Sequence, residues 1–97
     1  MFNIIFPDYY SNDEFAQFET ESKGYLFGVK MIVDKDVYEL VFYDLARLKQ
    51  DSEDEQKESN YFHEPNLIIL ERVSKDLIIK AVTNIYNRGE VQYLLKD

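Results

Sequence analysis

Two apolar segments on either side of a short polar tripeptide constrain the fold of this chain more than any other feature. The segments are YLFGVKMIV, residues 25–33, and VYELVFY, residues 37–43, and both are rich in β-branched and aromatic residues. Such residues favour extended structure, and the intervening Asp34-Lys35-Asp36 is typical of a tight turn. We therefore predict a central β-hairpin. Gly28, inside the first arm, predicts a bulge or the close approach of another backbone.

The N-terminal third contains one further strand signal and one helix signal. Residues 1–6 are largely apolar and end at Pro7, which predicts a short strand. Ser11 and Glu14 have the spacing of a capping box, so a short helix is expected from about Asn12, although the alternation of residues 18–22 also suits a strand. In the simplest interpretation, Phe15 and Phe18 of this helix pack into the core and its acidic side chains face water.

The second half of the sequence contains signals for a helix, a strand, a second helix and a short tail. Asp44 is placed to cap a helix to about Lys49, followed by a solvated helical extension or loop through Asn60. Residues 66–73 predict a strand that is buried on both faces over LIIL. Ser74 is placed to cap the helix with the clearest apolar stripe, which ends at Asn87-Arg88-Gly89. Residues 91–95 are expected to dock on the domain as a short strand.

This order of elements predicts an α+β fold in one small domain, residues 1–97. We expect a mixed or antiparallel sheet built on the central hairpin, with two main helices packed on one face. The chain has 97 residues and no cysteine, so its stability must come from its core or from a partner. The cysteine count, the N-terminal segment and the lack of an apolar run of about 18 residues predict a cytoplasmic protein without a signal peptide or membrane span.

The formal charge of −8 is concentrated in two segments. Residues 8–21 contain five acidic residues and no basic one, and residues 51–58 contain five acidic residues and one lysine. The rest of the chain is close to neutral. Clustered negative charge disfavours nucleic acid and anionic membranes as partners and favours a basic protein.

We predict that a partner binds the exposed aromatic and acidic side chains of these two segments. The candidate residues are Tyr9, Tyr10, Asp13, Glu14, Asp51, Glu53, Asp54, Glu55 and Glu58. Aromatic side chains contribute contact area at interfaces, and carboxylates attract a basic partner over a longer range. The simpler interpretation is that both segments only keep the protein soluble.

The sequence contains no pattern that predicts catalysis, a metal or a cofactor. His63 is the single histidine, and the adjacent Glu64 would point to the opposite face of an extended segment. The run from Asp51 lacks the glycine and the distal glutamate of a calcium loop, because Gln56 and Phe62 stand at those positions. We therefore expect a protein that is not an enzyme.

In its size, acidic charge, lack of cysteine and expected α+β class, the chain resembles small bacterial immunity proteins of contact-dependent and polymorphic toxin systems. This resemblance is one of type and transfers no residue roles. It implies a protein that neutralises a basic, nuclease-type toxin domain by direct binding. Two alternatives are an acidic nucleic-acid mimic that blocks a DNA-binding protein and a homo-oligomer, such as a dimer formed through the hairpin edge or the tail at residues 90–95.

Overall fold

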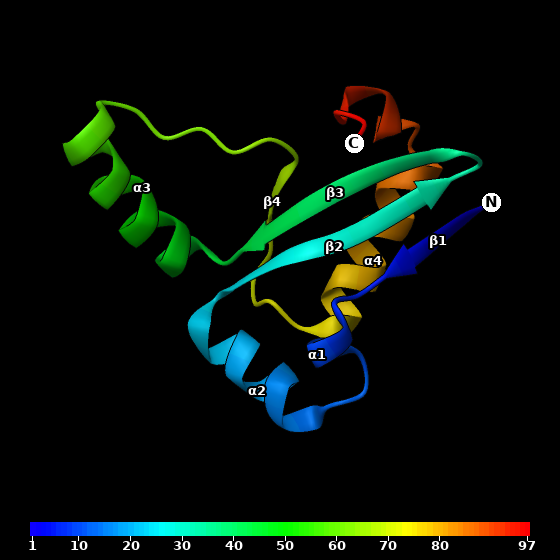
Figure 1. Ribbon diagram of the computed structural model, residues 1–97, viewed down its shortest axis with the longest axis horizontal. Coiled ribbons are helices and arrows are strands. Elements are labelled where there is room, and N and C mark those ends of the chain that lie inside the picture. The colour runs from blue at the N-terminus through cyan, green and yellow to red at the C-terminus, as the bar shows by residue number, and fades with distance from the viewer.

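The computed structural model describes all 97 residues and has nine secondary-structure elements (Figure 1). In chain order these are β1 (Phe2–Ile5), α1 (Asp8–Ser11), α2 (Glu14–Lys23), β2 (Tyr25–Val33), β3 (Asp36–Tyr43), α3 (Leu45–Ser59), β4 (Leu67–Ile69), α4 (Lys75–Asn87) and the 3₁₀ helix η1 (Glu90–Tyr93). The expected α+β class is confirmed.

The four strands form one mixed sheet in the order β1-β2-β3-β4. The predicted hairpin is present as β2 and β3, and β1 pairs antiparallel with β2. The pairing of β2 with β3 shifts between Leu26 and Val29, and Gly28 at this shift has a φ of +82°. The predicted bulge is therefore confirmed, and glycine fits it because L side chains rarely adopt this backbone conformation.

One face of the sheet carries the hydrophobic core, and α4 covers it (Figure 1). The strands contribute fully buried side chains from alternating positions, as a half-buried sheet requires. These side chains are Leu26, Val29, Met31, Leu40 and Phe42. Ile78 and Val82, one turn apart on α4, pack against them. As predicted, Ser74 caps α4, its hydroxyl accepting a hydrogen bond from the Leu77 amide.

The predicted strand of residues 66–73 is shorter and more exposed than expected. β4 covers only three residues, runs parallel to β3 and forms an edge of the sheet. Ile69 is 48% exposed. The prediction of burial on both faces was wrong because β4 has a strand on one side only and because the single covering helix, α4, lies on one face.

The C-terminal tail docks as predicted but not as a strand. Residues 90–93 form η1, and the chain then passes beside β3, where the Asp97 amide donates a hydrogen bond to the Val37 carbonyl at 2.7 Å. The Asn66 side chain holds the tail more firmly, since it donates to the Leu95 and Glu39 carbonyls and accepts from the Leu95 amide.

The two outer helices are attached mainly by polar contacts. α2 begins two residues later than the capping-box pattern predicts, because Asp13 rather than Ser11 accepts hydrogen bonds from the first free amides. α3 begins after the Asp44 cap, as expected, and continues as a helix to Ser59 with no buried residue. It therefore extends from the sheet instead of packing on it (Figure 1). No helix has both the length and the hydropathy to cross a membrane.

A tight contact joins the end of α2 to the start of α3. Gly24 ends α2 with a φ of +79°, and its carbonyl accepts a hydrogen bond from the Asp44 amide at 2.9 Å. A Cβ atom on residue 24 would lie 2.5–2.7 Å from the Asp44 carboxylate, which caps α3. The relative position of the two helices thus depends on the absence of a side chain at Gly24.

We expect Gly24→Ala to lower the free energy of unfolding by about 3 kcal/mol, because alanine is strained in the left-handed conformation and its Cβ would displace the Asp44 cap. Gly89→Ala is the matched control, because Gly89 has a φ of +70° with no atom within 4 Å of the added Cβ. Gly89→Ala should lower the free energy of unfolding by only about 1 kcal/mol. Urea denaturation of both variants measures the difference, and equal losses would contradict the proposed role of the Gly24–Asp44 contact.

Candidate functional site

The most unusual surface of the molecule is the outer side of α2. Phe15 and Phe18 are 69% and 68% exposed, so the expectation that they pack into the core is wrong. The opposite side of α2 faces the protein with small or polar residues: Thr20 is buried, and the Gln17 amide donates to the carbonyls of Tyr10 and Ser11. These hydrogen bonds set the rotation of α2 and leave both rings in solvent.

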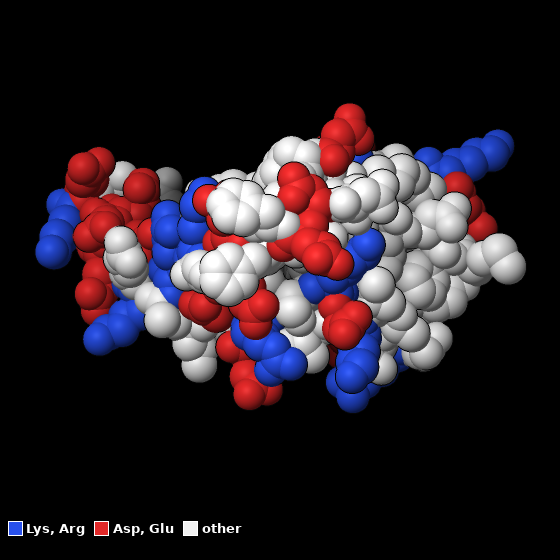
Figure 2. Space-filling model, turned by 90° about the horizontal axis from the view of Figure 1, so that it is seen from below, with Lys and Arg blue, Asp and Glu red and all other residues white.

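Carboxylates surround the two exposed rings. The spacing of these carboxylates and rings along α2 places them on one side of the helix. We call this side the α2 face. Its residues are Glu14, Phe15, Phe18, Glu19 and Glu21. Figure 2 shows aromatic rings among acidic side chains over the region of α2. Exposed apolar rings within a charged rim have the composition of a protein-binding surface.

The other candidate residues of the N-terminal segment differ in exposure and in the contacts that they make. Tyr9 is 63% exposed on α1 and remains available to a partner. Asp13 is exposed, but its carboxylate caps α2 by accepting from the Phe15 and Ala16 amides.

Tyr10 is a core residue, and its assignment as a partner-binding residue was wrong. It has no exposed surface, and its ring stacks on Phe6 with a centroid distance of 5.4 Å. Its hydroxyl has no hydrogen-bond partner. Burial raises the pKa of this hydroxyl, and the negative charges of Glu21 and Asp76 raise it further.

The acidic run of residues 51–58 forms the outer turns of α3. Asp51, Asp54, Glu55 and Glu58 have the i, i+3, i+4, i+7 spacing of one helix side, whereas Glu53 lies on another side. Asp51 is the only one of these carboxylates in a close ion pair, with its Oδ1 2.9 Å from Arg47 Nε. Asp54, Glu55 and Glu58 are exposed.

Arg47 attaches α3 to the rest of the molecule and separates the two acidic surfaces. Its guanidinium lies 4.3 Å from the centroid of the Tyr25 ring and donates to the Lys23 carbonyl at the end of α2. In Figure 2, basic side chains lie between the acidic group over α2 and the acidic group at the end of the molecule formed by α3. The structure therefore does not merge the two acidic segments into one continuous surface.

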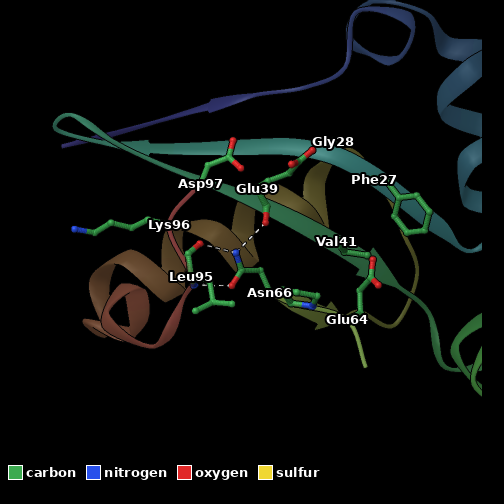
Figure 3. Close-up of a pocket in the computed structure, with 10 residues that line it drawn as sticks. Phe27, Gly28, Glu39, Val41, Glu64, Asn66, Leu95, Lys96 and Asp97 are labelled. Atoms are coloured by element: carbon green, nitrogen blue, oxygen red, sulfur yellow. Dashed lines mark hydrogen bonds between the residues drawn. The ribbon is translucent and has the colours of Figure 1, made fainter. Parts of the chain in front are cut away.

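Two main cavities open on the surface. The larger, about 520 Å³, lies between the outer face of the hairpin, the loop before β4 and the C-terminal tail (Figure 3). Asn66 lies in its centre and is hydrogen-bonded to Leu95 and Glu39, while Phe27 and Glu64 lie to one side. Because the Asn66 side chain is hydrogen-bonded both to Leu95 of the tail and to Glu39 of β3, we interpret this cavity as a structural junction between the two. The smaller, about 360 Å³, lies beside Phe18, between α2 and the start of α4.

No group of three or more histidine or acidic side chains has an arrangement that could hold a metal ion, and His63 is exposed. Sequence reasoning missed the exposure of Phe15 and Phe18. The spacing of the two rings is the same whether they face the core or water, and the only available signal was the lack of other large apolar residues on α2. It also missed Asp76, which the fold brings next to α2.

Comparisons with protein-family models, curated proteins and solved structures give no match for this chain.

We expect Arg47→Met to loosen α3, because the side chain loses its contacts with Asp51, Tyr25 and the Lys23 carbonyl. The free energy of local opening should fall by about 1 kcal/mol, and amide hydrogen exchange in α3 should become roughly fivefold faster. Lys49→Met is the control, since the Lys49–Glu53 pair is exposed and separated by 3.9 Å. Unchanged α3 exchange in Arg47→Met would show that another contact holds the helix.

The raised pKa of Tyr10 predicts a loss of stability at high pH. The unfolded chain releases the Tyr10 proton near the ordinary tyrosine pKa of about 10, whereas the folded chain retains it to higher pH. The free energy of unfolding should therefore fall as the pH rises above about 10. Denaturation at about pH 8 and about pH 10.5 should show a smaller fall for Tyr10→Phe than for wild type. Tyr93→Phe, at an exposed position, should retain the full fall.

Proposed function

We propose that the protein is a non-catalytic inhibitor that binds a basic protein through the α2 face. The observation that carries the proposal is the exposure of Phe15 and Phe18 among carboxylates on a helix whose rotation is fixed by hydrogen bonds. A buried phenylalanine side chain contributes about 1.5–3 kcal/mol, so two exposed rings are a substantial source of binding free energy. The surrounding acids favour a partner with a positive surface.

The acidic side of α3 has a different role in this proposal. Its exposed side chains, Asp54, Glu55 and Glu58, offer no apolar contact area. Surface carboxylates of this kind accelerate association with a positively charged protein and contribute little to the lifetime of the complex. We assign α3 to steering the partner toward the molecule and the α2 face to holding it.

A nuclease-type toxin is the partner class that we favour. Such a protein carries a positively charged cleft for nucleic acid, which is complementary to a chain with a charge of −8. Direct occlusion of the cleft would neutralise the toxin without any catalytic group in the inhibitor. The resemblance in type to bacterial immunity proteins supports the same assignment.

The two alternatives have less support from the geometry. A nucleic-acid mimic requires a continuous array of carboxylates, and Arg47 lies between α2 and the acidic turns of α3. A dimer through the hairpin edge is disfavoured because β2 lies between β1 and β3, and β3 is flanked by β4 and the C-terminal tail. The free strand edges belong to β1 and β4 instead.

The decisive experiment compares capture of a partner by the wild type and by the double variant Phe15→Ser/Phe18→Ser. The immobilised proteins are exposed at low salt to nuclease-treated lysate of the source cells, and salt-eluted proteins are identified by mass spectrometry. We expect one basic protein to bind the wild type, and affinity to fall at least 100-fold in the double variant, consistent with a loss of about 3 kcal/mol. The purified partner should cleave nucleic acid, and the wild-type protein should block this cleavage.

Tyr93→Ser is the matched control, because Tyr93 is 77% exposed on η1, which lies apart from α2 (Figure 1). It should capture the partner as well as the wild type does. Equal capture by the double variant and the wild type would refute the role of the α2 face. A captured partner whose activity is unaffected by binding would refute inhibition.

A further inference from the structure

β1 forms an edge of the sheet that no other segment of the chain covers. The strand order gives β1 a neighbour on one side only, and Figure 1 shows no element along its outer side. The backbone hydrogen bonds outside the helices and strands include none from Phe2–Ile5. The opposite side of the sheet is more closed, because β4 and the C-terminal tail both lie beside β3. The outward-facing amides and carbonyls of β1 are therefore free to pair with another strand.

β1 also lacks the features by which proteins protect a free strand edge. Such edges usually carry a charged side chain, a proline or a bulge. The sequence of β1 is Phe-Asn-Ile-Ile, which contains neither a charge nor a proline, and its pairing with β2 has no break in register. Ile5 is 48% exposed. This edge is therefore open to the addition of an extended strand.

The margin of the hydrophobic core is open at the same edge. Phe2, Ile4 and Phe6 pack against the core cluster but are only partly buried. Asn3 and Ile5 point to the other face and are exposed. A strand added beside β1 would therefore cover both the free backbone groups and the apolar side chains at the margin of the core.

We propose that β1 pairs antiparallel with β1 of a second copy of this chain, so that the two sheets become continuous. A two-fold axis perpendicular to the sheet produces such a pair, and it leaves both cores on the same face. Because the axis passes between one residue and its own copy, even-numbered residues lie opposite even-numbered ones. Phe2 and Ile4 of one copy thus meet Phe2 and Ile4 of the other, and the two cores join. This dimer does not depend on the proposed function.

The distribution of charge is compatible with a second copy at this edge. Two chains of charge −8 repel each other unless their contact lies away from the excess charge. Residues 1–7 contain no charged side chain, and the acidic turns of α3 lie at the opposite end of the molecule (Figure 1). The molecule is 41 Å long, several times the Debye length of about 8 Å at physiological ionic strength. The nearest charges along the chain and across the sheet, Asp8 and Lys30, have opposite signs.

The proposed interface is small, so the dimer should be weak. β1 has four residues, and an antiparallel pair of this length contains few hydrogen bonds. Small interfaces are typical of transient complexes. We expect the full-length protein to be monomeric at low micromolar concentration and to form dimers as the concentration approaches the millimolar range.

Sedimentation equilibrium over this concentration range tests the proposal with the double variant Asn3→Glu/Ile5→Glu. Whether Asn3 or Ile4 lies on the axis, the variant places two glutamates opposite each other across the dimer. It should weaken dimerisation at least about 10-fold. Both positions are exposed, and a glutamate at position 5 lies opposite Lys30 within the molecule, so β1 should remain paired with β2.

Gln50→Glu/Gln56→Glu is the matched control. It adds the same two charges at exposed positions of α3, at the other end of the molecule. Because these charges lie farther than a Debye length from the proposed interface, dimerisation should weaken less than about twofold. A general repulsion between more acidic chains would affect both variants equally.

Spin labels provide a second measurement that does not depend on how well the glutamate variant folds. The chain has no cysteine, so a single introduced cysteine can be labelled specifically. A label on Asn3→Cys should show dipolar broadening that increases with protein concentration, because the two labels lie close together across the axis. A label on Gln56→Cys should show none.

A protein that stays monomeric at millimolar concentration would overturn the proposal. A dimer that Asn3→Glu/Ile5→Glu and Gln50→Glu/Gln56→Glu weaken equally, or broadening at residue 56 in place of residue 3, would also overturn it, since either result places the contact elsewhere.

Discussion

The hydrophobic core lies on one face of the β2–β3 hairpin, and α4 is the helix that covers it. Only 14 of the 97 residues are buried, and most of them belong to β2, β3 and α4. A chain of this length buries a smaller fraction of its surface than a large domain does, because that fraction rises with chain size. The two longer remaining helices, α2 and α3, contribute no residue to the core cluster.

Polar contacts hold in place the segments that lie outside the hydrophobic core. Gln17 fixes α2 against α1, the Asp44 cap and Gly24 join α2 to α3, and Arg47 holds the first turns of α3. Asn66 performs the same role for the C-terminal tail. Such contacts contribute modest free energy but are directional. Their effect is to fix which side of each outer helix faces water, and this determines the binding surfaces.

The two acidic segments have separate roles in the proposed complex. The carboxylates of α3 act over a distance comparable to the Debye length, about 8 Å at physiological ionic strength, and they affect the rate of encounter. The α2 face combines carboxylates with Phe15 and Phe18, whose burial would stabilise the complex.

The sequence by itself determined the local elements: the hairpin with its Gly28 bulge, the Asp44 and Ser74 caps, the end of α4 before Gly89, and the α+β class. Each of these depends on neighbouring residues, through side-chain alternation, capping or backbone conformation. The sequence also located the excess charge. Tertiary structure alone decided that Tyr10 is buried, that Phe15 and Phe18 are exposed, that β4 is a short edge strand and that Asp76 faces α2. The physical reason is that a residue's burial depends on which segment covers it, and contacts between distant segments leave no periodic pattern in the chain.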